Sequence, residues 1–292
     1  MRLNRLAVRA VGTAAGSALL VVGLAAKPAA AQSFVPCAPT ALANAITTAN
    51  VAGGMLVLAP GCVYSLPTAL PHIENRITIE GGGATITRAL AAPSFRIFTV
   101  DNTGDLSLHR AIISNGQVSG DFGGAIRNDG MLTVTRSVIR DNQADYGGGI
   151  GGNTGSTARI SRSYISGNTA LQEGGGLANE GTMTVNESFI TGNDAVEKGG
   201  GVTNDGTLKV SRTAIESNTA SGPSGVGGGI VNSVAGGLAK LSESIVINNT
   251  ATDAPGGIYD DTATILLHRT TVVANQPTNC AGSPTPVLHC VN

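Results

Sequence analysis

The sequence predicts an all-β fold, a right-handed parallel β-helix solenoid in which short strands stack coil upon coil, with a short N-terminal helical cap. Three observations support this prediction. Glycine clusters recur every 24 to 28 residues, short alternating runs typical of strands follow the clusters, and the composition is rich in glycine and poor in aromatic residues. Gly makes up 41 of the 292 residues and Trp is absent, so the core must be built from Ile, Val, Leu and Ala.

Each repeat opens with a glycine cluster and an aliphatic residue, and in most repeats an Asn or Asp follows two positions later. The aliphatic residues are Ile126, Ile150, Leu177, Val202, Ile230 and Ile258. An alternating run comes next, and then a segment of the form Ser/Thr-x-aliphatic-x-x-Asn, which first occurs from Ser137 to Asn142. Each repeat therefore predicts three strands, and stacking buries the inward residues that one repeat alone leaves exposed.

The recurring asparagines and glycines have expected roles in such a stack. We expect the asparagines to lie in turns at positive φ and to bond through their amides to the same Asn one coil away. The glycines allow the positive φ and the close backbone approach of a tight corner. Neighbouring coils should lie about 4.8 Å apart, each strand pairing in parallel with its copies above and below.

The first 31 residues have the pattern of a secretory signal peptide. Three arginines within the first nine residues precede an apolar run over residues 18–26, and residues 29–31 are small, as at a cleavage site. Cleavage after Ala31 leaves a secreted, extracellular chain without a membrane span. We expect residues 32–292 to form one β-helix domain, with a cap and first coil at 32–66, degenerate coils at 67–122, regular coils at 123–275 and a disulfide cap at 276–292.

The N-terminal end of the solenoid needs a cover, because an exposed end coil offers unpaired strand edges. Residues 39–50 predict a helix that covers this end, with Thr40 as the N-cap and with Leu42, Ala43 and Ile46 on one face.

The four cysteines lie in two local pairs near the two ends of the chain. Three pairings are possible, and we expect Cys37–Cys62 and Cys280–Cys290, because each then closes one end. No CxxC pair is present, which argues against zinc. We expect neither a metal nor a cofactor.

The charge balance bears on the partners. The formal charge of −1 becomes −5 once the four cations of residues 1–31 are removed. Neither Lys nor Arg is then in excess, which argues against nucleic acid and anionic lipid as partners. An extracellular polysaccharide or a surface protein is the expected partner, and we expect a monomer.

One column of charged residues precedes the third strand of each coil. It reads Arg110, Arg136, Arg162, Glu187, Arg212, Glu243 and Arg269. From Arg162 onward the signs alternate, which predicts a solvated row of ion pairs. Arg110, Arg136 and Arg162 are like-charged, and they are either a binding stripe for an anionic polymer such as an acidic polysaccharide or are neutralised by carboxylates elsewhere.

A column of carboxylates follows the glycine corner and includes Asp129, Glu180 and Asp205. Residues one coil apart would lie near the separation of about 5 Å that a retaining glycosidase uses, and residues two coils apart near the inverting range. These three are candidate catalytic residues, although Asp and Glu are also ordinary turn residues beside glycine. Tyr146, near Asp145 and Asp121, is a further candidate.

Two motifs of the repeat resemble those of bacterial polymorphic outer membrane proteins and related β-helix repeat proteins. They are the glycine motif, which first reads Gly-Gly-Ala-Ile at residues 123–126, and the aliphatic-x-x-Asn motif. The resemblance covers residues 123–275, about half the chain. It implies a right-handed β-helix on the cell exterior, often with an adhesive role. In that family the second motif usually begins with Phe, whereas Ile139, Ile165 and their equivalents are aliphatic here.

These observations favour a non-catalytic, adhesin-like binding or scaffold protein that acts through a lateral face. The alternative is a carbohydrate-active enzyme, a polysaccharide lyase or glycoside hydrolase, on the same scaffold. An enzyme should interrupt the repeat with a long loop that builds a groove wall. The longest expected irregularities, residues 220–226 and 233–237, are short and favour binding.

Overall fold

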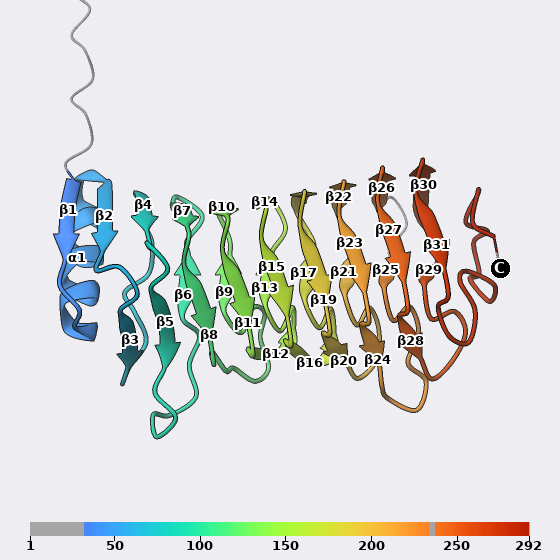
Figure 1. Cartoon of the computed structure of the whole chain (residues 1–292), viewed down its shortest axis with the longest axis horizontal. Helices are drawn as coiled ribbons and strands as arrows, with labels where there is room; N and C mark the ends of the chain where they lie inside the picture. Colours follow the sequence, from blue (N-terminus) through green and yellow to red (C-terminus); the bar gives the residue numbers. More distant parts are fainter. Residues whose placement is uncertain (1–31, 234–236, 292) are drawn as a thin grey trace, which may run out of the picture.

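The computed structural model of the chain describes residues 32–233 and 237–291. These residues form a right-handed parallel β-helix built of four stacked sheets, which confirms the predicted fold (Figure 1). We name the four sheets A to D and give their strands below. In each regular coil the chain passes through one strand of sheet C, then of sheets A, B and D, and the described strand pairs are parallel.

Sheets A and B form the two longest stacks. Sheet A contains β1 (Gln32–Val35), β2 (Gly54–Leu58), β4 (Arg76–Glu80), β7 (Asp105–His109), β10 (Met131–Thr135), β14 (Thr157–Ser161), β18 (Thr182–Asn186), β22 (Thr207–Ser211), β26 (Leu238–Ser242) and β30 (Thr264–His268). Sheet B contains β3 (Val63–Leu66), β5 (Thr85–Arg88), β8 (Ile112–Ser114), β11 (Val138–Arg140), β15 (Tyr164–Ser166), β19 (Phe189–Thr191), β23 (Ala214–Glu216), β27 (Ile245–Ile247) and β31 (Thr271–Val273).

Sheets C and D contain fewer strands, seven and five. Sheet C contains β6 (Phe98–Val100), β9 (Ile126–Asn128), β13 (Ile150–Gly152), β17 (Leu177–Asn179), β21 (Val202–Asn204), β25 (Ile230–Asn232) and β29 (Ile258–Asp260). Sheet D contains β12 (Gln143–Tyr146), β16 (Thr169–Glu173), β20 (Asp194–Ala195), β24 (Thr219–Ala220) and β28 (Thr250–Ala251).

The register places like residues on like residues. Ile150 pairs with Ile126 on one side and with Leu177 on the other, and the aliphatic residues after the glycine clusters are fully buried. The three predicted strands per coil are present. The structure adds the short strand of sheet D, whose inward residue is a buried alanine such as Ala170 or Ala195.

The asparagines that end the third repeat segment are buried and not in turns. They are Asn142, Asn168, Asn193, Asn218, Asn249 and Asn275, and together they form an asparagine ladder. Nδ2 of Asn168 donates to Oδ1 of Asn193 at 2.9 Å, so the expected bond between coils is confirmed. The prediction of positive φ is wrong, because that conformation belongs to the preceding residue, as at Asp141 with φ of 57°. An amide that bonds to both neighbouring coils has to face the interior.

A single residue turns the chain from sheet A into sheet B. Its φ is between 46° and 51° in all seven coils that carry the column of charged residues. A Ser or Thr follows it in six of these coils and Ala111 in the other, and Ser137, Ser163, Ser188, Thr213 and Ser244 are buried. Oγ of Ser163 accepts from the backbone N–H of Ser137 at 3.1 Å and donates to the carbonyl of Ser161 at 2.8 Å. The charged column therefore lies on a corner whose inner side is fixed by hydrogen bonds.

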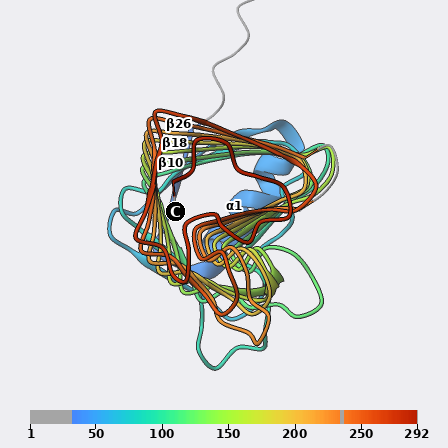
Figure 2. The same ribbon diagram turned by 90° about the vertical axis from the view of Figure 1, so that its right-hand side faces the viewer.

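Helix α1 (Pro39–Ala52) covers the N-terminal end, as predicted. Its side chains Leu42 and Ile46 are fully buried, and the helix lies across the end of the coils when the molecule is viewed along its axis (Figure 2). The assignment of Thr40 as N-cap is wrong. Ala38 is the N-cap, because Pro39 starts the helix and leaves Thr40 inside its first turn.

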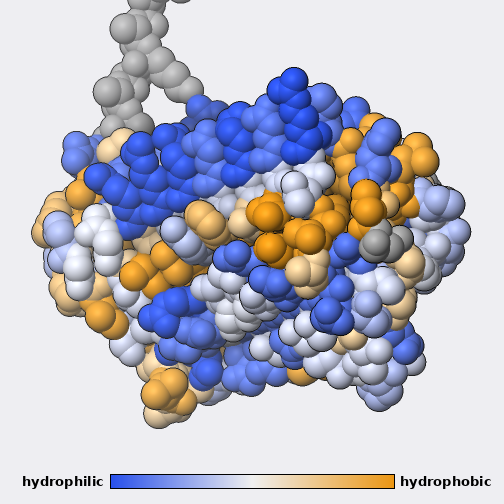
Figure 3. Space-filling model, turned by 45° about the vertical axis from the view of Figure 1, so that its right-hand side comes forward, coloured by the Kyte–Doolittle hydropathy of each residue, from blue (hydrophilic) through white to orange (hydrophobic). Residues whose placement is uncertain are grey.

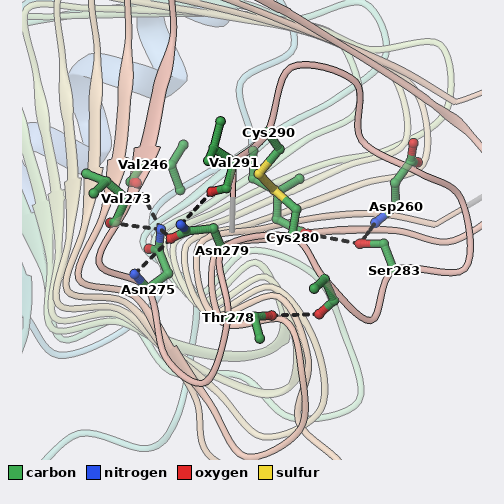
Figure 4. The surroundings of a disulfide bond; sticks show 12 residues. Val246, Asp260, Val273, Asn275, Thr278, Asn279, Cys280, Ser283, Cys290 and Val291 are labelled. Atoms are coloured by element: carbon green, nitrogen blue, oxygen red, sulfur yellow. Dashed lines mark hydrogen bonds between the residues drawn. A yellow bond between two sulfur atoms is a disulfide. The ribbon is translucent and has the colours of Figure 1, made fainter.

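Both predicted disulfides are present. Cys37 and Cys62 lie 5.7 Å apart between Cα atoms, and Cys280 and Cys290 lie 6.3 Å apart. At the C-terminal end Nδ2 of Asn275 donates to Oδ1 of Asn279 at 3.0 Å, and Asn279 donates to the carbonyl of Val291 beside the disulfide (Figure 4). The residues that flank the disulfide, Asn279 and Val291, therefore supply the last partners of the asparagine ladder.

Three irregular segments in the degenerate coils are longer than those expected from the sequence. They are residues 67–75, between β3 and β4, residues 89–97, between β5 and β6, and residues 115–125, between β8 and β9. The prediction that residues 220–226 are the longest irregularity is therefore wrong, and part of the second expected segment, residues 234–236, lies outside the described residues. The second and third of these loops project from one side of the stack (Figure 2).

Within residues 32–233 and 237–291, no helix is long and apolar enough to cross a membrane. The predicted signal peptide, residues 1–31, lies outside the described residues.

We predict that Asn193→Ala lowers the free energy of unfolding by about 2–4 kcal/mol, because it leaves buried polar groups without partners. Asn193 now accepts from the backbone N–H and side chain of Asn168 and donates to the carbonyl of Ile165 at 2.9 Å. Urea unfolding followed by circular dichroism measures the change. Thr184→Ala, on the outer face of the same coil, should alter stability by less than about 0.5 kcal/mol. Equal effects of the two substitutions would contradict this role for the asparagine ladder.

Candidate functional site

The residue just before each glycine cluster forms a column that lies over the outer face of sheet C. Phe122 is bridged to Tyr146, Tyr146 to Glu173, and Glu173 to Lys198. The next residue is a glycine at positive φ, such as Gly147 or Gly174, and a Cβ there would lie 2.5 Å from a carbonyl oxygen of sheet C. The glycine lets the chain fold back tightly, so this column and sheet C meet at a concave angle.

A hollow of about 270 Å³ lies in that angle. Its floor is the outward middle position of sheet C, where Gly151 and Ala178 stand between the larger Arg127 and Thr203. The small floor residues leave the space open. Its walls include Phe122, Tyr146, Glu173, Glu180, Thr203 and Asp205.

Three of the candidate residues meet in this hollow: Tyr146, Glu180 and Asp205. Asn179 pairs with Asn204 in sheet C, so the residues that follow them, Glu180 and Asp205, are stacked about 4.8 Å apart. The register thus places their backbones one coil apart, and the separation of their carboxyl groups stays a prediction. Their roles stay predictions.

Glu173 is a wall residue that the repeat pattern did not single out. Its carboxylate lies 3.5 Å from Nζ of Lys198. The signal that could have identified it is its place directly before a glycine cluster, which Phe122, Tyr146 and Lys198 share.

Burial raises the pKa of two carboxyls in the hollow. For Glu173, burial is the main cause, Lys198 opposes it, and the charge of Asp205 adds to it. For Asp205, burial again comes first and the charge of Glu180 adds to it. The hollow therefore favours the protonated form of these groups more than water does.

The aromatic wall is a stacked pair. The rings of Phe122 and Tyr146 lie 4.9 Å apart between centroids. The hydroxyl of Tyr146 donates to Oε1 of Gln172 at 2.5 Å, and Nε2 of Gln172 donates to Asp145 at 3.1 Å. These bonds fix the orientation of the Tyr146 ring.

Asp129, by contrast, belongs to an ion-pair network and does not line the hollow. Arg127 bonds to Asp129 at 3.0 Å and to Asp121 at 3.1 Å, and Arg96 bonds to Asp121 at 2.8 Å. Burial acts to raise the pKa of Asp121, but the hydrogen bond from Arg96, together with the other bonds and charges, holds it below its usual range. Asp121 and Asp129 are thus neutralised carboxylates. In the described part of the chain, no group of three or more His, Cys, Asp or Glu side chains is placed to hold a metal ion.

The column of charged residues lies on the corner between sheets A and B. Glu187 pairs with Arg162 at 3.9 Å and with Arg212 at 3.0 Å, so the alternating row of ion pairs is confirmed there. Arg110 is neutralised by Glu80 at 3.3 Å. Arg136 is exposed, and no described carboxylate pairs with it. Its role in binding, and that of Arg110 and Arg162, stay predictions.

No protein-family model matches the chain, and no curated protein matches it. Among solved structures the chain is similar to the crystal structure of pectate lyase Pel9A, at a TM-score of 0.40 and 12% sequence identity, over 87% of this chain and 82% of that one. A likeness of this size does not bear on activity. The resemblance to polymorphic outer membrane protein repeats stays a prediction.

We predict that Asp205→Asn raises the melting temperature at pH 7 and that the gain shrinks towards pH 3. A raised pKa means that the folded state disfavours the charged carboxylate, so the cost appears as pH rises above the usual Asp value of about 3.9. Asn removes that cost. Thermal unfolding across this pH range measures the difference.

Glu187→Gln is the control of opposite sign. Hydrogen bonds from Asn186 and Arg212 lower the pKa of Glu187, so its contribution to stability is present at neutral pH and is lost in acid. This variant should be less stable than the wild type at pH 7. The same pH dependence of stability in both variants would contradict the opposite pKa shifts of Asp205 and Glu187.

Proposed function

We propose that the hollow between sheets C and D is a carbohydrate-binding site. The observation that carries this proposal is the meeting, in one concave site of about 270 Å³, of an oriented aromatic pair with three carboxylates and the Thr203 hydroxyl. Carboxylates and hydroxyls accept hydrogen bonds from sugar hydroxyls, and aromatic rings cover the apolar faces of sugars.

Charge narrows the class of sugar. Glu173, Glu180 and Asp205 face the hollow, and Lys198, which pairs with Glu173, does not line it. This excess of carboxylates repels uronate or sulfated chains and favours neutral or amino sugars. We therefore propose a neutral or cationic glycan as the ligand of the hollow.

The raised pKa values favour hydrolysis as a second candidate function. A carboxyl whose pKa is raised by burial stays protonated to higher pH and can donate a proton to a glycosidic oxygen, and a neighbouring carboxylate can activate water or attack the sugar. In this proposal Glu173 is the proton donor, and Asp205 and Glu180 supply the second carboxylate. The bond broken is the glycosidic C–O bond, and water supplies the hydroxyl group to one product and the proton to the other.

The remaining proposals concern location. Two disulfides are typical of an extracellular protein. With the signal pattern of residues 1–31 and the resemblance to outer membrane protein repeats, they support a secreted protein with an adhesin-like or scaffold role.

The test is an array of neutral glycans (xylan, galactan and β-glucan) and of chitosan, with retention and release of reducing sugar both measured. We expect retention of the wild type and a loss of at least about tenfold in affinity for Ala178→Leu, whose side chain fills the floor of the hollow. Thr184→Leu, on sheet A of the same coil, is the matched control and should bind like the wild type. No retention on any glycan, or equal retention by both variants, would overturn the proposed site.

A second variant separates binding from hydrolysis. Glu173→Gln should retain the glycan and abolish any release of reducing sugar, because Gln cannot donate the proton. Release by the wild type that persists in this variant would exclude Glu173 as the donor, and retention without release in the wild type would leave a binding protein.

A further inference from the structure

The outer face of sheet A carries an excess of positive charge that the overall balance conceals. Strands β10, β14, β18, β22 and β26 contain no Asp or Glu, and Arg159, Lys209 and Lys240 stand at their outward middle position. The corner between sheets A and B adds four arginines and two glutamates to these three cations. They are Arg136, Arg162, Glu187, Arg212, Glu243 and Arg269, so this face holds seven cations and two carboxylates, a local charge of +5.

The cations form two parallel rows. The first is the middle position of sheet A, where Arg159 aligns with Thr184, Thr184 with Lys209, and Lys209 with Lys240, so that Thr184 separates Arg159 from the two lysines. The second is the corner, three residues further along each strand and thus about 10 Å away. All three side chains of the first row are exposed, and among the described residues no carboxylate pairs with any of them.

A row of hydroxyl groups lies between the two rows of cations. It is the last position of the sheet A strands and contains Thr135, Ser161, Ser211 and Ser242. Oγ1 of Thr135 and Oγ of Ser161 lie 3.2 Å apart, and in the next coil Asn186 takes this position and accepts a hydrogen bond from Oγ of Ser211 at 2.8 Å. Figure 3 shows a continuous hydrophilic band along the upper side of the molecule, where the strands of sheet A lie in Figure 1. We call the two rows of cations with the hydroxyl row between them the basic track.

We propose that the basic track binds a linear acidic polysaccharide that lies along the axis of the β-helix, separately from the ligand of the hollow. Cations recur on both sides at multiples of the coil spacing of about 4.8 Å, and the hydroxyls between them can donate to the sugar. The carboxylates Glu180 and Asp205 lie at the opposite edge of sheet A, and they confine an anionic chain to the edge next to sheet B.

An acidic polysaccharide fits the basic track better than a nucleic acid does. Proteins that bind single strands place aromatic side chains under the bases, in addition to a basic groove. The five sheet A strands of the track contain no aromatic residue. The aromatic pair nearest to the track, the stacked and exposed Tyr164 and Phe189, lies on sheet B, two residues beyond the corner, and so not between the two rows of cations.

The test is retention of the protein on immobilised polygalacturonate and chondroitin sulfate, with neutral dextran as reference and a salt gradient for elution. We expect retention that weakens with salt and a loss of about tenfold in affinity for Lys209→Glu, which removes one charge-assisted contact. Arg140→Glu, an exposed residue of sheet B, changes the net charge equally and should cost less than about twofold. The triple variant Arg159→Gln, Lys209→Gln and Lys240→Gln should not be retained. Ala178→Leu, which alters the hollow, should be retained like the wild type.

Three results would overturn the proposal. One is no retention on either polyanion at low salt. Another is an equal loss for Lys209→Glu and Arg140→Glu, which would mean that only net charge matters. The third is tighter binding to single-stranded DNA or to anionic phosphatidylglycerol vesicles than to the polysaccharides, which would assign the track to another partner. Unchanged thermal unfolding of each variant shows that the fold is intact.

Discussion

The asparagine ladder is the constraint on which the rest of the β-helix depends. Each amide in it donates to the next coil and accepts from the previous one, as Asn193 does between Asn168 and Asn218. These groups are buried, so shifting one coil by a single residue would leave several of them without partners. The ladder thereby fixes the register of sheets C, A and B. The register in turn sets which side chains stand side by side on the surface.

Because the register is fixed, surface chemistry is organised in columns. Equivalent positions of adjacent coils contact each other in three places. These are the ion pairs of alternating sign along the corner, the stacked rings of Phe122 and Tyr146, and the ion pair of Glu173 with Lys198. The same geometry separates the charges. Carboxylates collect around the hollow and at one edge of sheet A, and unpaired cations collect towards the other edge. A chain with a near-zero formal charge thus presents two faces of opposite sign.

The repeat pattern predicts much of this architecture. It identifies the strands of sheets A, B and C and the buried aliphatic columns, because period and alternation report directly on burial. Both disulfides follow instead from the position of one cysteine pair near each end of the chain. It also identifies Glu180 and Asp205, which follow an equivalent position in each coil. Three of the five strands of sheet D, β20, β24 and β28, have two residues and cannot show alternation, although Asn-x-Ala recurs at the start of all five. Glu173 was missed because the register of sheet D shifts between Ala144 and Tyr146, so the wall of the hollow is aligned from the glycine clusters and not from the asparagines.

The one-residue corner between sheets A and B decides where this protein can vary in length. A corner of one residue at positive φ, with a hydrogen-bonded Ser or Thr directly after it, has no room for an insertion. The segments between sheets D and C do have room, as the difference between residues 115–125 and the equivalent part of later coils shows. Insertions and deletions are therefore tolerated at the wall of the hollow and excluded from the basic track. In a lineage of such proteins, the ligand of the hollow could diversify by loop exchange, whereas the opposite face could change only by substitution.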